Sequence, residues 1–386
     1  MFSGRRALLG LAILGGAFRD HAMKTTVALL LPLLWPLAAA AQMESNSSWG
    51  VVLAAAKAEG KVVVVGPPTA EMRQRVPATF KARYGITVEY LGGRSSDLTA
   101  RLRAERNAGV YSVDAVLSGI DSMSSFFYRE KMLDPLRPAL MLPEVIDGSK
   151  WKSGKLWFVD PDDNYVLRIA NSVSNLFHIN TDFVKPGDLV SAQDLLAPKL
   201  KGLIAVEDPL VTGSGSNHAA HLYLQLGPDF IRKFYIDQKP MISRDNRVLT
   251  DALLRGTHPI VLGAEDSDVD TMAKEGARVK LLQGFSDLQP PVSSGYGHLG
   301  IMHNAPHPNA AKVFVNWMAS KEGAELYSRA RGSASTRNDI DQSFLPPEVI
   351  PREGVKYFDN HDWEYTVTKK EEARQAVRKI LEELRR

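Results

Sequence analysis

The sequence predicts an α/β fold built from doubly wound sheets. Three segments predict it, because each contains β-branched or other apolar residues typical of a strand and is followed by a Gly- or Ser-containing turn, and the first contains four consecutive valines. Apolar runs of this kind are typical of strands buried on both faces of a parallel sheet. Their alternation with helical segments indicates a doubly wound arrangement. The three segments are residues 61–65, 86–90 and 113–117.

The turns that follow these strands contain most of the small and polar residues of this region. The first is Gly-Pro-Pro-Thr, ending at Thr69, the second is Gly-Gly-Arg-Ser-Ser over residues 92–96, and the third begins at Ser118. Residues 135–163 are rich in proline, tryptophan and acidic residues, and we expect them to cross between two domains. Helices are expected over residues 49–59, from about residue 70, and over residues 97–108.

The remainder of the chain repeats the alternation. Further strands are expected over residues 165–170, 175–179, 202–206, 260–263, 279–282 and 295–302. Further helices are expected over residues 192–196, 218–226 and 309–319, with an amphipathic helix from about residue 370. A Gly-Ser loop over residues 212–217 is expected directly ahead of the 218–226 helix.

The first 41 residues are predicted to be an export signal. Two apolar runs, residues 7–18 and 27–41, are each shorter than the roughly 18 to 20 residues that span a bilayer. The second run follows Met23 and a lysine and ends in three alanines, the small-residue pattern of a cleavage site. The first run follows two arginines, so the chain either starts at Met23 or carries a twin-arginine-type signal. The charged interruption between the runs favours a start at Met23.

The charge balance argues against a nucleic-acid-binding role. Residues 1–41 contain four basic residues and one acidic residue, which account for the formal charge of +3. The rest of the chain keeps 43 of the 47 basic and 43 of the 44 acidic residues. A nucleic-acid-binding surface needs a basic stripe that neutralises the phosphate backbone, and this neutral chain has none ahead of its C-terminal helix. The absence of cysteine excludes disulfides, thiolate metal sites and a lipoprotein anchor.

Four sequence segments occur in an order that is specific to one protein family. In chain order they are residues 54–62 (AAAKAEGKV), 177–182 (FHINTD), 200–205 (LKGLIA) and 305–323 (APHPNAAKVFVNWMASKEG). In this order they resemble the family 1 extracellular solute-binding proteins of ferric-iron-type ABC importers. The resemblance covers roughly residues 49–332.

The resemblance implies a periplasmic binding protein of type II, in which two doubly wound α/β lobes are joined by two crossover strands and close on a solute. It implies a first lobe over residues 42–170 and 294–345, a second lobe over residues 171–293, and a C-terminal extension over residues 346–386. It also implies a monomer, free in the periplasm, that delivers a small molecule to an inner-membrane ABC permease. Neither a cofactor nor a nucleic-acid partner is expected.

Several polar residues occur where strands end, which is where ligands lie in open α/β sheets. The strongest candidate is the Thr-Gly-Ser-Gly-Ser-Asn run, since free amides at a helix N-terminus attract anions. The loop over residues 92–96 has the same form, and Arg94 can bind a carboxylate or phosphate with both guanidinium arms. The alternative for the Thr-Gly-Ser-Gly-Ser-Asn run is a flexible loop that ends in a helix cap, and the alternative for Arg94 is an arginine exposed to solvent. The candidates are Thr69, Arg94, Ser95, Ser118, Thr212, Ser214, Ser216, Asn217 and Arg244.

Ferric members of this family carry neighbouring tyrosines at a position that here is Ala-Glu-Asp-Ser-Asp, residues 264–268. This departure favours a small organic anion, such as a carboxylate, phosphonate or sugar phosphate, with ferric iron or a ferric chelate as the alternative. Glu265 and Asp266 are candidates to bind a cation or a hydroxylated solute, or else to cap a helix. Tyr296 is a candidate to stack on the ligand, or else is an ordinary strand tyrosine.

An exported hydrolase is the remote alternative, and no catalytic residue is expected. Residues 213–217 (GSGSN) lack the last glycine of the G-x-S-x-G motif. His218 and His221 are three residues apart, whereas the helical zinc motif H-E-x-x-H needs a spacing of four. Three further histidines close in sequence are interpreted as structural: His298, His303 and His307.

Overall fold

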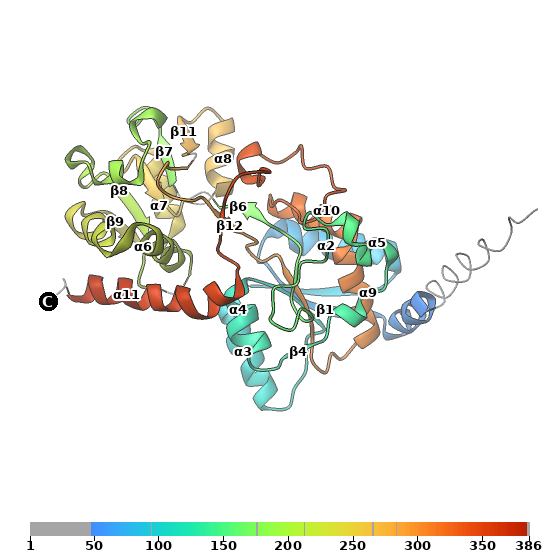
Figure 1. Cartoon of the computed structure of the whole chain (residues 1–386). Helices are drawn as coiled ribbons and strands as arrows, with labels where there is room; N and C mark the ends of the chain where they lie inside the picture. The colour runs from blue at the N-terminus through green and yellow to red at the C-terminus, as the bar shows by residue number, and fades with distance from the viewer. Residues whose placement is uncertain are drawn as a thin grey trace, which may run out of the picture. The chain divides into compact units, whose positions relative to one another are not determined.

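The structure is a computed structural model that describes residues 48–93, 95–174, 177–211, 213–264, 266–282 and 284–383 (Figure 1). The predicted signal segment lies outside these ranges. The described residues form two α/β lobes, each built around one sheet, and a third, three-stranded sheet that joins them. This architecture confirms the predicted pair of lobes with crossover strands. None of the helices in the described ranges is both long and apolar enough to cross a bilayer.

The first lobe contains a six-stranded sheet in the order β2-β1-β3-β13-β4, with β5 paired to β13. β1 is parallel to β2 and β3, as the apolar runs predict. β13 returns antiparallel to β3 and places His298 opposite Ser118. The carboxyl ends of β1, β2 and β3 and the start of β13 therefore lie at one edge. The strands are β1 (Lys61–Gly66), β2 (Thr87–Gly92), β3 (Ala115–Ser118), β4 (Leu133–Asp134), β5 (Leu167–Arg168) and β13 (His298–Met302).

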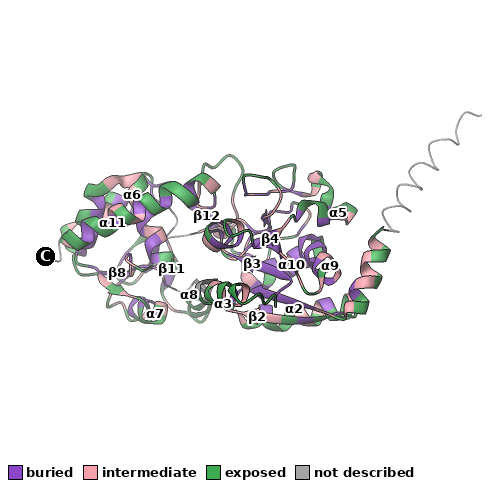
Figure 2. Ribbon diagram, turned by 90° about the horizontal axis from the view of Figure 1, so that it is seen from below, coloured by how far each residue is buried: buried purple, intermediate pink, exposed green. Residues whose placement is uncertain are grey.

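Helices cover both faces of this sheet, which explains its continuous apolar strands. Val62 and Val64 face the core that contains α2, α9, α10 and the helix over residues 48–59. Val63 and Val65 face the core that contains α3 and η1. In Figure 2 the colour of buried residues gathers around β3, β4, α9 and α10 in this lobe. The helices are α2 (Ala70–Tyr84), α3 (Ser95–Asn107), α4 (Ile120–Ser122), η1 (Met123–Tyr128), η2 (Arg137–Ala139), α5 (Pro143–Ile146), η3 (Gly148–Lys150), α9 (Pro308–Ala319) and α10 (Lys321–Arg331).

The second lobe contains a five-stranded sheet in the order β11-β7-β10-β8-β9. β8 is parallel to β9 and β10, so these strands end at the same edge. Its strands are β7 (Phe177–Asn180), β8 (Ile204–Glu207), β9 (Met241–Ser243), β10 (Ile260–Leu262) and β11 (Val279–Leu281). Its helices are η4 (Pro186–Asp188), η5 (Ala192–Leu196), η6 (Pro198–Leu200), α6 (Ser214–Arg232), η7 (Lys233–Asp237), α7 (Asn246–Leu254) and α8 (Asp266–Lys274).

The third sheet is the hinge between the lobes. β6 (Ser172–Val173) leads into the second lobe, and β12 (Pro291–Ser293) returns antiparallel to it. The C-terminal part of the chain adds β14 (Phe358–Asp359) parallel to β12. It continues through η9 (Tyr365–Lys369) into α11 (Lys370–Glu383), which packs against α6 of the second lobe (Figure 1). The remaining short helix is η8 (Pro347–Val349).

Two expectations about local structure are wrong. Residues 135–163 do not cross between the lobes but belong to the first one, where Trp151 is buried in the core and Asp160 accepts hydrogen bonds from the backbone of Tyr165 and Val166. The helix expected from residue 218 begins at Ser214. Most of the predicted Gly-Ser loop is therefore the first turn of α6.

Candidate ligand-binding site

The loops after β1 and β2 are held together at the carboxyl edge of the first sheet. The Tyr90 hydroxyl donates to the Pro67 carbonyl at 3.0 Å, and the Arg73 guanidinium donates to the Gly92 carbonyl at 2.8 Å. A Cβ added to Gly66 would lie 2.3 Å from the Tyr90 hydroxyl, so only glycine fits there. The two loops therefore form one rigid surface.

Thr69 lies at the N-cap of α2 but does not cap the helix. Its backbone is extended, and its side chain makes no capping hydrogen bond. The Oγ1 atom is buried and has no hydrogen-bond partner. A buried polar group without a protein partner calls for a water, an ion or a ligand to satisfy it. Thr69 therefore keeps a hydroxyl available at this edge.

The loop after β3 lies beside the turn that precedes β13. Ser118 is buried at the end of β3, and a Cβ added to Gly119 would lie 3.4 Å from the Gly295 carbonyl oxygen. Tyr296 follows this glycine and is half-buried. Ser118 and Tyr296, two candidates distant in sequence, thus belong to the same edge of the first lobe.

Arg331, the last residue of α10, also lies at this edge. Its guanidinium carbon lies 5.7 Å from the Tyr296 ring centroid. The Arg331 Nε and the Tyr327 hydroxyl are both buried without a hydrogen-bond partner. Burial raises the pKa of Tyr327 to about 12, although the Arg331 cation opposes this shift. Burial also raises the pKa of Tyr90, and the neighbouring Tyr327 adds to this increase. The structure thus assembles a cation and three tyrosines, of which only Tyr296 was a sequence candidate.

At the edge of the second lobe, the first turn of α6 is packed against the end of β8. A Cβ added to Gly215 would lie 2.5 Å from the Asp208 carbonyl oxygen, so glycine is required for this approach. The Ser216 hydroxyl donates to the Gly213 carbonyl at 3.0 Å and accepts from the Gly213 amide at 3.2 Å. Ser216 therefore closes the helix turn, whereas Ser214 is exposed.

Arg244 stabilises the loop that connects β8 to α6. Its Nε lies 3.0 Å from Asp208 Oδ2, and the other oxygen of Asp208 accepts from the Leu210 amide at 2.9 Å. The Arg244 side chain is 75% exposed in this arrangement. Its guanidinium is already engaged in an ion pair within its own lobe.

Asn217 connects the second lobe to the first through the C-terminal helix. Its side-chain oxygen accepts a hydrogen bond from Arg374 of α11, and the same guanidinium nitrogen lies 3.2 Å from Asp121 Oδ2. Asp121 follows Ser118 by three residues and also pairs with the buried Lys370. Burial raises the pKa of Asp121, but Lys370 and Arg374 more than reverse this effect, so it lies below its ordinary value. Spacing in the sequence gave no sign of this link.

Comparison with known proteins identifies the family. A family model of bacterial extracellular solute-binding proteins matches residues 75–351. The chain belongs to this family. It is the solute-binding component of an ABC importer, as the sequence resemblance implied.

Relatives of this solute-binding protein share its fold at low sequence identity. An uncharacterized protein of Haemophilus influenzae is 23% identical over 292 residues, which cover 71% of this chain and 77% of that protein. The periplasmic binding protein AfuA of Actinobacillus pleuropneumoniae, bound to fructose 6-phosphate, superposes with a TM-score of 0.62 at 18% identity, covering 84% of this chain and 99% of its own. Iron-bound HitA of Pseudomonas aeruginosa superposes with a TM-score of 0.64 at 16% identity, covering 83% and 99%.

Some candidate residues of the solute-binding protein lie outside the described structure. These are Arg94, Thr212 and Glu265, together with the side chains of Ser95 and Asp266. The backbone of Ser95 begins α3, and that of Asp266 begins α8. The two residues therefore stand at the starts of helices that follow β2 and β10.

The three histidines close in sequence, His298, His303 and His307, do not come together. His303 pairs with Asp134 at 2.7 Å, and His307 pairs with Asp114 at 2.9 Å. His298 is buried at the start of β13, where its ring stacks on that of His361 with the centroids 5.1 Å apart. Across the part of the chain that the structure describes, no three histidine, aspartate or glutamate side chains are grouped to hold a metal ion.

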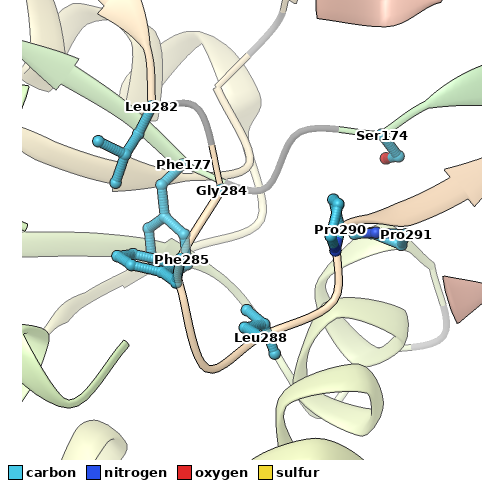
Figure 3. Close-up of a pocket in the computed structure, with 8 residues that line it drawn as sticks. All are labelled: Ser174, Phe177, Leu282, Gly284, Phe285, Leu288, Pro290 and Pro291. Atoms are coloured by element: carbon cyan, nitrogen blue, oxygen red, sulfur yellow. The ribbon is translucent and has the colours of Figure 1, made fainter. Parts of the chain in front are cut away.

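Two cavities lie in the second lobe and its junction with the hinge, and neither is lined by a candidate residue. The first has a volume of about 20 Å³, room for about one water molecule, and its walls are mostly apolar (Figure 3). It is lined by Ser174, Phe177, Leu282, Gly284, Phe285, Leu288, Pro290 and Pro291. The second has a volume of about 230 Å³ and is lined by Asp208, Pro209, Leu210, Tyr235, Ile236, Lys239, Ile242 and Leu381.

Proposed function

We propose that this protein captures a small organic anion between its lobes and delivers it to an ABC permease in the inner membrane. The favoured ligands are carboxylates, phosphonates and sugar phosphates. The protein acts as a monomer in the periplasm after its signal segment is cleaved, and it is not lipid-anchored. We expect N-terminal sequencing of the exported protein to give Gln42 as the first residue. A protein that still begins at Met23 would contradict cleavage of the signal segment.

The observation that carries this proposal is a set of three buried donors of the first lobe that make no hydrogen bond. Thr69 Oγ1, the Tyr327 hydroxyl and Arg331 Nε are buried without partners. All three can donate, and Arg331 adds a positive charge. A ligand that satisfies them must supply acceptor oxygens and negative charge. Carboxylates and phosphates have this chemistry, and Arg binds both well.

The second lobe supports the same ligand class through its backbone. The first amides of α6 have no partner within the helix and lie at the positive end of its dipole. A helix terminus contributes roughly 0.3 to 2 kcal/mol, whereas micromolar affinity needs about 8 kcal/mol. Groups from both lobes must therefore contribute.

The decisive experiment begins with native mass spectrometry of the protein as purified. Calorimetry with fructose 6-phosphate, a dicarboxylate and ferric citrate then compares Arg331→Gln with Arg329→Gln, a variant of the same helix whose ion pair with Glu325 is on the surface. Loss of one charge-assisted contact is expected to weaken anion binding by about 10- to 100-fold in the first variant only. Equal affinities in both variants would remove Arg331 from the site.

Ferric iron is the competing ligand, and ferric citrate tests it. We expect no visible tyrosinate-to-iron absorption band, because the neighbouring tyrosines of ferric family members are absent at residues 264–268. If the protein showed this band and Tyr296→Phe abolished it, ferric iron would replace the organic anion as the favoured ligand. Turnover of ester or phosphate substrates that is lost in Ser214→Ala would instead support an enzyme.

A further inference from the structure

The C-terminal segment from Phe358 to Glu383 contacts the hinge and both lobes. Two chain crossings, β6 and β12, already connect the lobes. The C-terminal segment follows the same route a third time, from the hinge sheet past the first lobe to the core of the second. Its contacts with the hinge, the first lobe and the second lobe are described in turn.

In the hinge, β14 is fastened by buried polar contacts. Asp359 forms an ion pair at 2.9 Å with Arg168, whose side chain is fully buried. The His361 ring accepts a hydrogen bond from the Ser294 amide at 3.1 Å. Arg168 belongs to β5 of the first lobe and Ser294 follows β12. The start of the C-terminal segment is therefore fixed to both the first lobe and the hinge.

The segment then contacts the first lobe close to the loop after β3. The Trp363 ring lies 4.9 Å from the Tyr128 ring of η1, centroid to centroid. Lys370, the first residue of α11, is buried and pairs with Asp121 of α4. The N-terminal end of α11 thus remains bound to the first lobe.

The rest of α11 belongs to the second lobe. Val377, Ile380 and Leu381 are buried in the core of that lobe. Arg378 donates to the Leu210 carbonyl at 2.9 Å, in the loop between β8 and α6. A rotation of one lobe against the other must therefore act on the first two turns of α11, between Lys370 and Val377.

Arg374 lies in these turns and contacts both lobes with one nitrogen. Its Nη2 donates to Asp121 of the first lobe and to Asn217 of the second. Asp121 lies three residues after the candidate Ser118, and Asn217 is itself a candidate ligand residue, three residues after Ser214. The Arg374 side chain is only 16% exposed, which limits screening by solvent.

We propose that Arg374 is a positioning residue that joins the ligand-binding edges of the two lobes and so sets how far they separate. The C-terminal helix is then a third crossing whose ionic contact limits the hinge motion. The consequence for ligand affinity rests on the proposed function, but the effect on lobe separation does not require a ligand.

Lobe separation can be measured directly because the chain has no cysteine. Spin labels at Lys81→Cys in α2 and Lys199→Cys in η6, two exposed positions in different lobes, report the distance by pulsed electron paramagnetic resonance. The full mature chain is measured after refolding from denaturant, with its solute-free state checked by native mass spectrometry. Arg374→Gln removes the charge, and Arg378→Gln is the matched control on the same helix.

We expect Arg374→Gln and Asp121→Asn to broaden the distance distribution about twofold, whereas Arg378→Gln leaves it unchanged. Because a lysine ammonium can still donate to both partners, Arg374→Lys is expected to restore the wild-type distribution. Because Asp121 also pairs with Lys370, the double variant of Arg374 and Asp121 should be no broader than Asp121→Asn alone. A wild-type distribution in Arg374→Gln, or equal broadening in Arg378→Gln, would overturn the proposal.

Discussion

The ligand-binding edges of the two lobes use their polar groups differently. In the first lobe, the donors of Thr69, Tyr327 and Arg331 have no protein partner. In the second lobe, Ser216 closes the first turn of α6, and Arg244 is paired with Asp208. The first edge therefore offers side chains to a ligand, whereas the second offers mainly backbone amides. Substitutions that remove only a side-chain polar group should therefore weaken ligand binding at the first edge more than at the second.

The largest expected effect is that of Gly215→Ala, because it displaces the backbone on which the second edge depends. The added methyl would approach the Asp208 carbonyl oxygen within 2.5 Å. Such crowding costs about 1–3 kcal/mol of folding stability. It also moves the α6 amides, so anion affinity should fall by at least about tenfold. Calorimetry and urea unfolding measure the two quantities.

Gly187→Ala is the matched control for that substitution. Gly187 lies in the same lobe, and a Cβ there meets nothing within 4 Å. Its affinity and its free energy of unfolding should equal those of the wild type. If Gly215→Ala behaved like Gly187→Ala, the second edge would not depend on the α6 turn.

The hinge and the adjoining start of β13 contrast with both edges because they contain two buried histidines, His361 and His298, and this predicts acid sensitivity. Burial, reinforced by Arg168, lowers the pKa of His298 to about 3. A histidine whose pKa is lower in the folded than in the unfolded state stabilises the fold above about pH 6.5, and this contribution is lost as the pH falls. At pH 5 the loss from His298 is about 2 kcal/mol.

Urea unfolding at pH 7.5 and pH 5.0 measures this loss. His298→Asn should show a smaller drop than the wild type, whereas His303→Asn, whose ring is partly exposed beside Asp134, should show the full drop. An equal drop in all three proteins would place the acid sensitivity on groups other than His298, such as the neighbouring buried His361.

Much of the fold could be predicted because local pattern and tertiary structure agree. The valines of β1 alternate between two cores, which is the condition that makes a continuous apolar run stable in a parallel sheet. The amphipathic pattern near residue 370 correctly gave α11. The 135–163 region was misread because prolines and acids mark any irregular segment, and here Asp160 satisfies the backbone of a loop in the first lobe.

The candidate site could be predicted only where its residues share a loop. Ser118 and Ser214 follow strands and are visible as Gly-Ser turns. Arg331 and Tyr90 are about 240 residues apart and interact electrostatically only after α10 packs against α2 and α9. Arg374 had no local signal either, because its partners belong to different lobes.

Ser216→Ala tests the edge of the second lobe with a smaller change. Its hydroxyl bonds twice to Gly213 within the helix turn, so its loss should lower the free energy of unfolding by about 1 kcal/mol. Anion affinity should change little, since the hydroxyl faces its own backbone. Ser214→Ala, at the exposed neighbouring position, should show the reverse pattern. A large affinity loss in Ser216→Ala would give this serine a direct role in binding.

Tyr327→Phe in the first lobe should have the opposite effect to Ser216→Ala, lowering anion affinity but not stability. The Tyr327 hydroxyl makes no hydrogen bond of normal geometry, so its removal breaks none and should change the free energy of unfolding little. If the hydroxyl donates to a bound anion, affinity should fall by about fivefold. Thermal unfolding without ligand and calorimetry with ligand distinguish the two effects. Unchanged affinity would mean that an internal water satisfies this hydroxyl, and the side-chain character of the first edge would then depend on Thr69 and Arg331 alone.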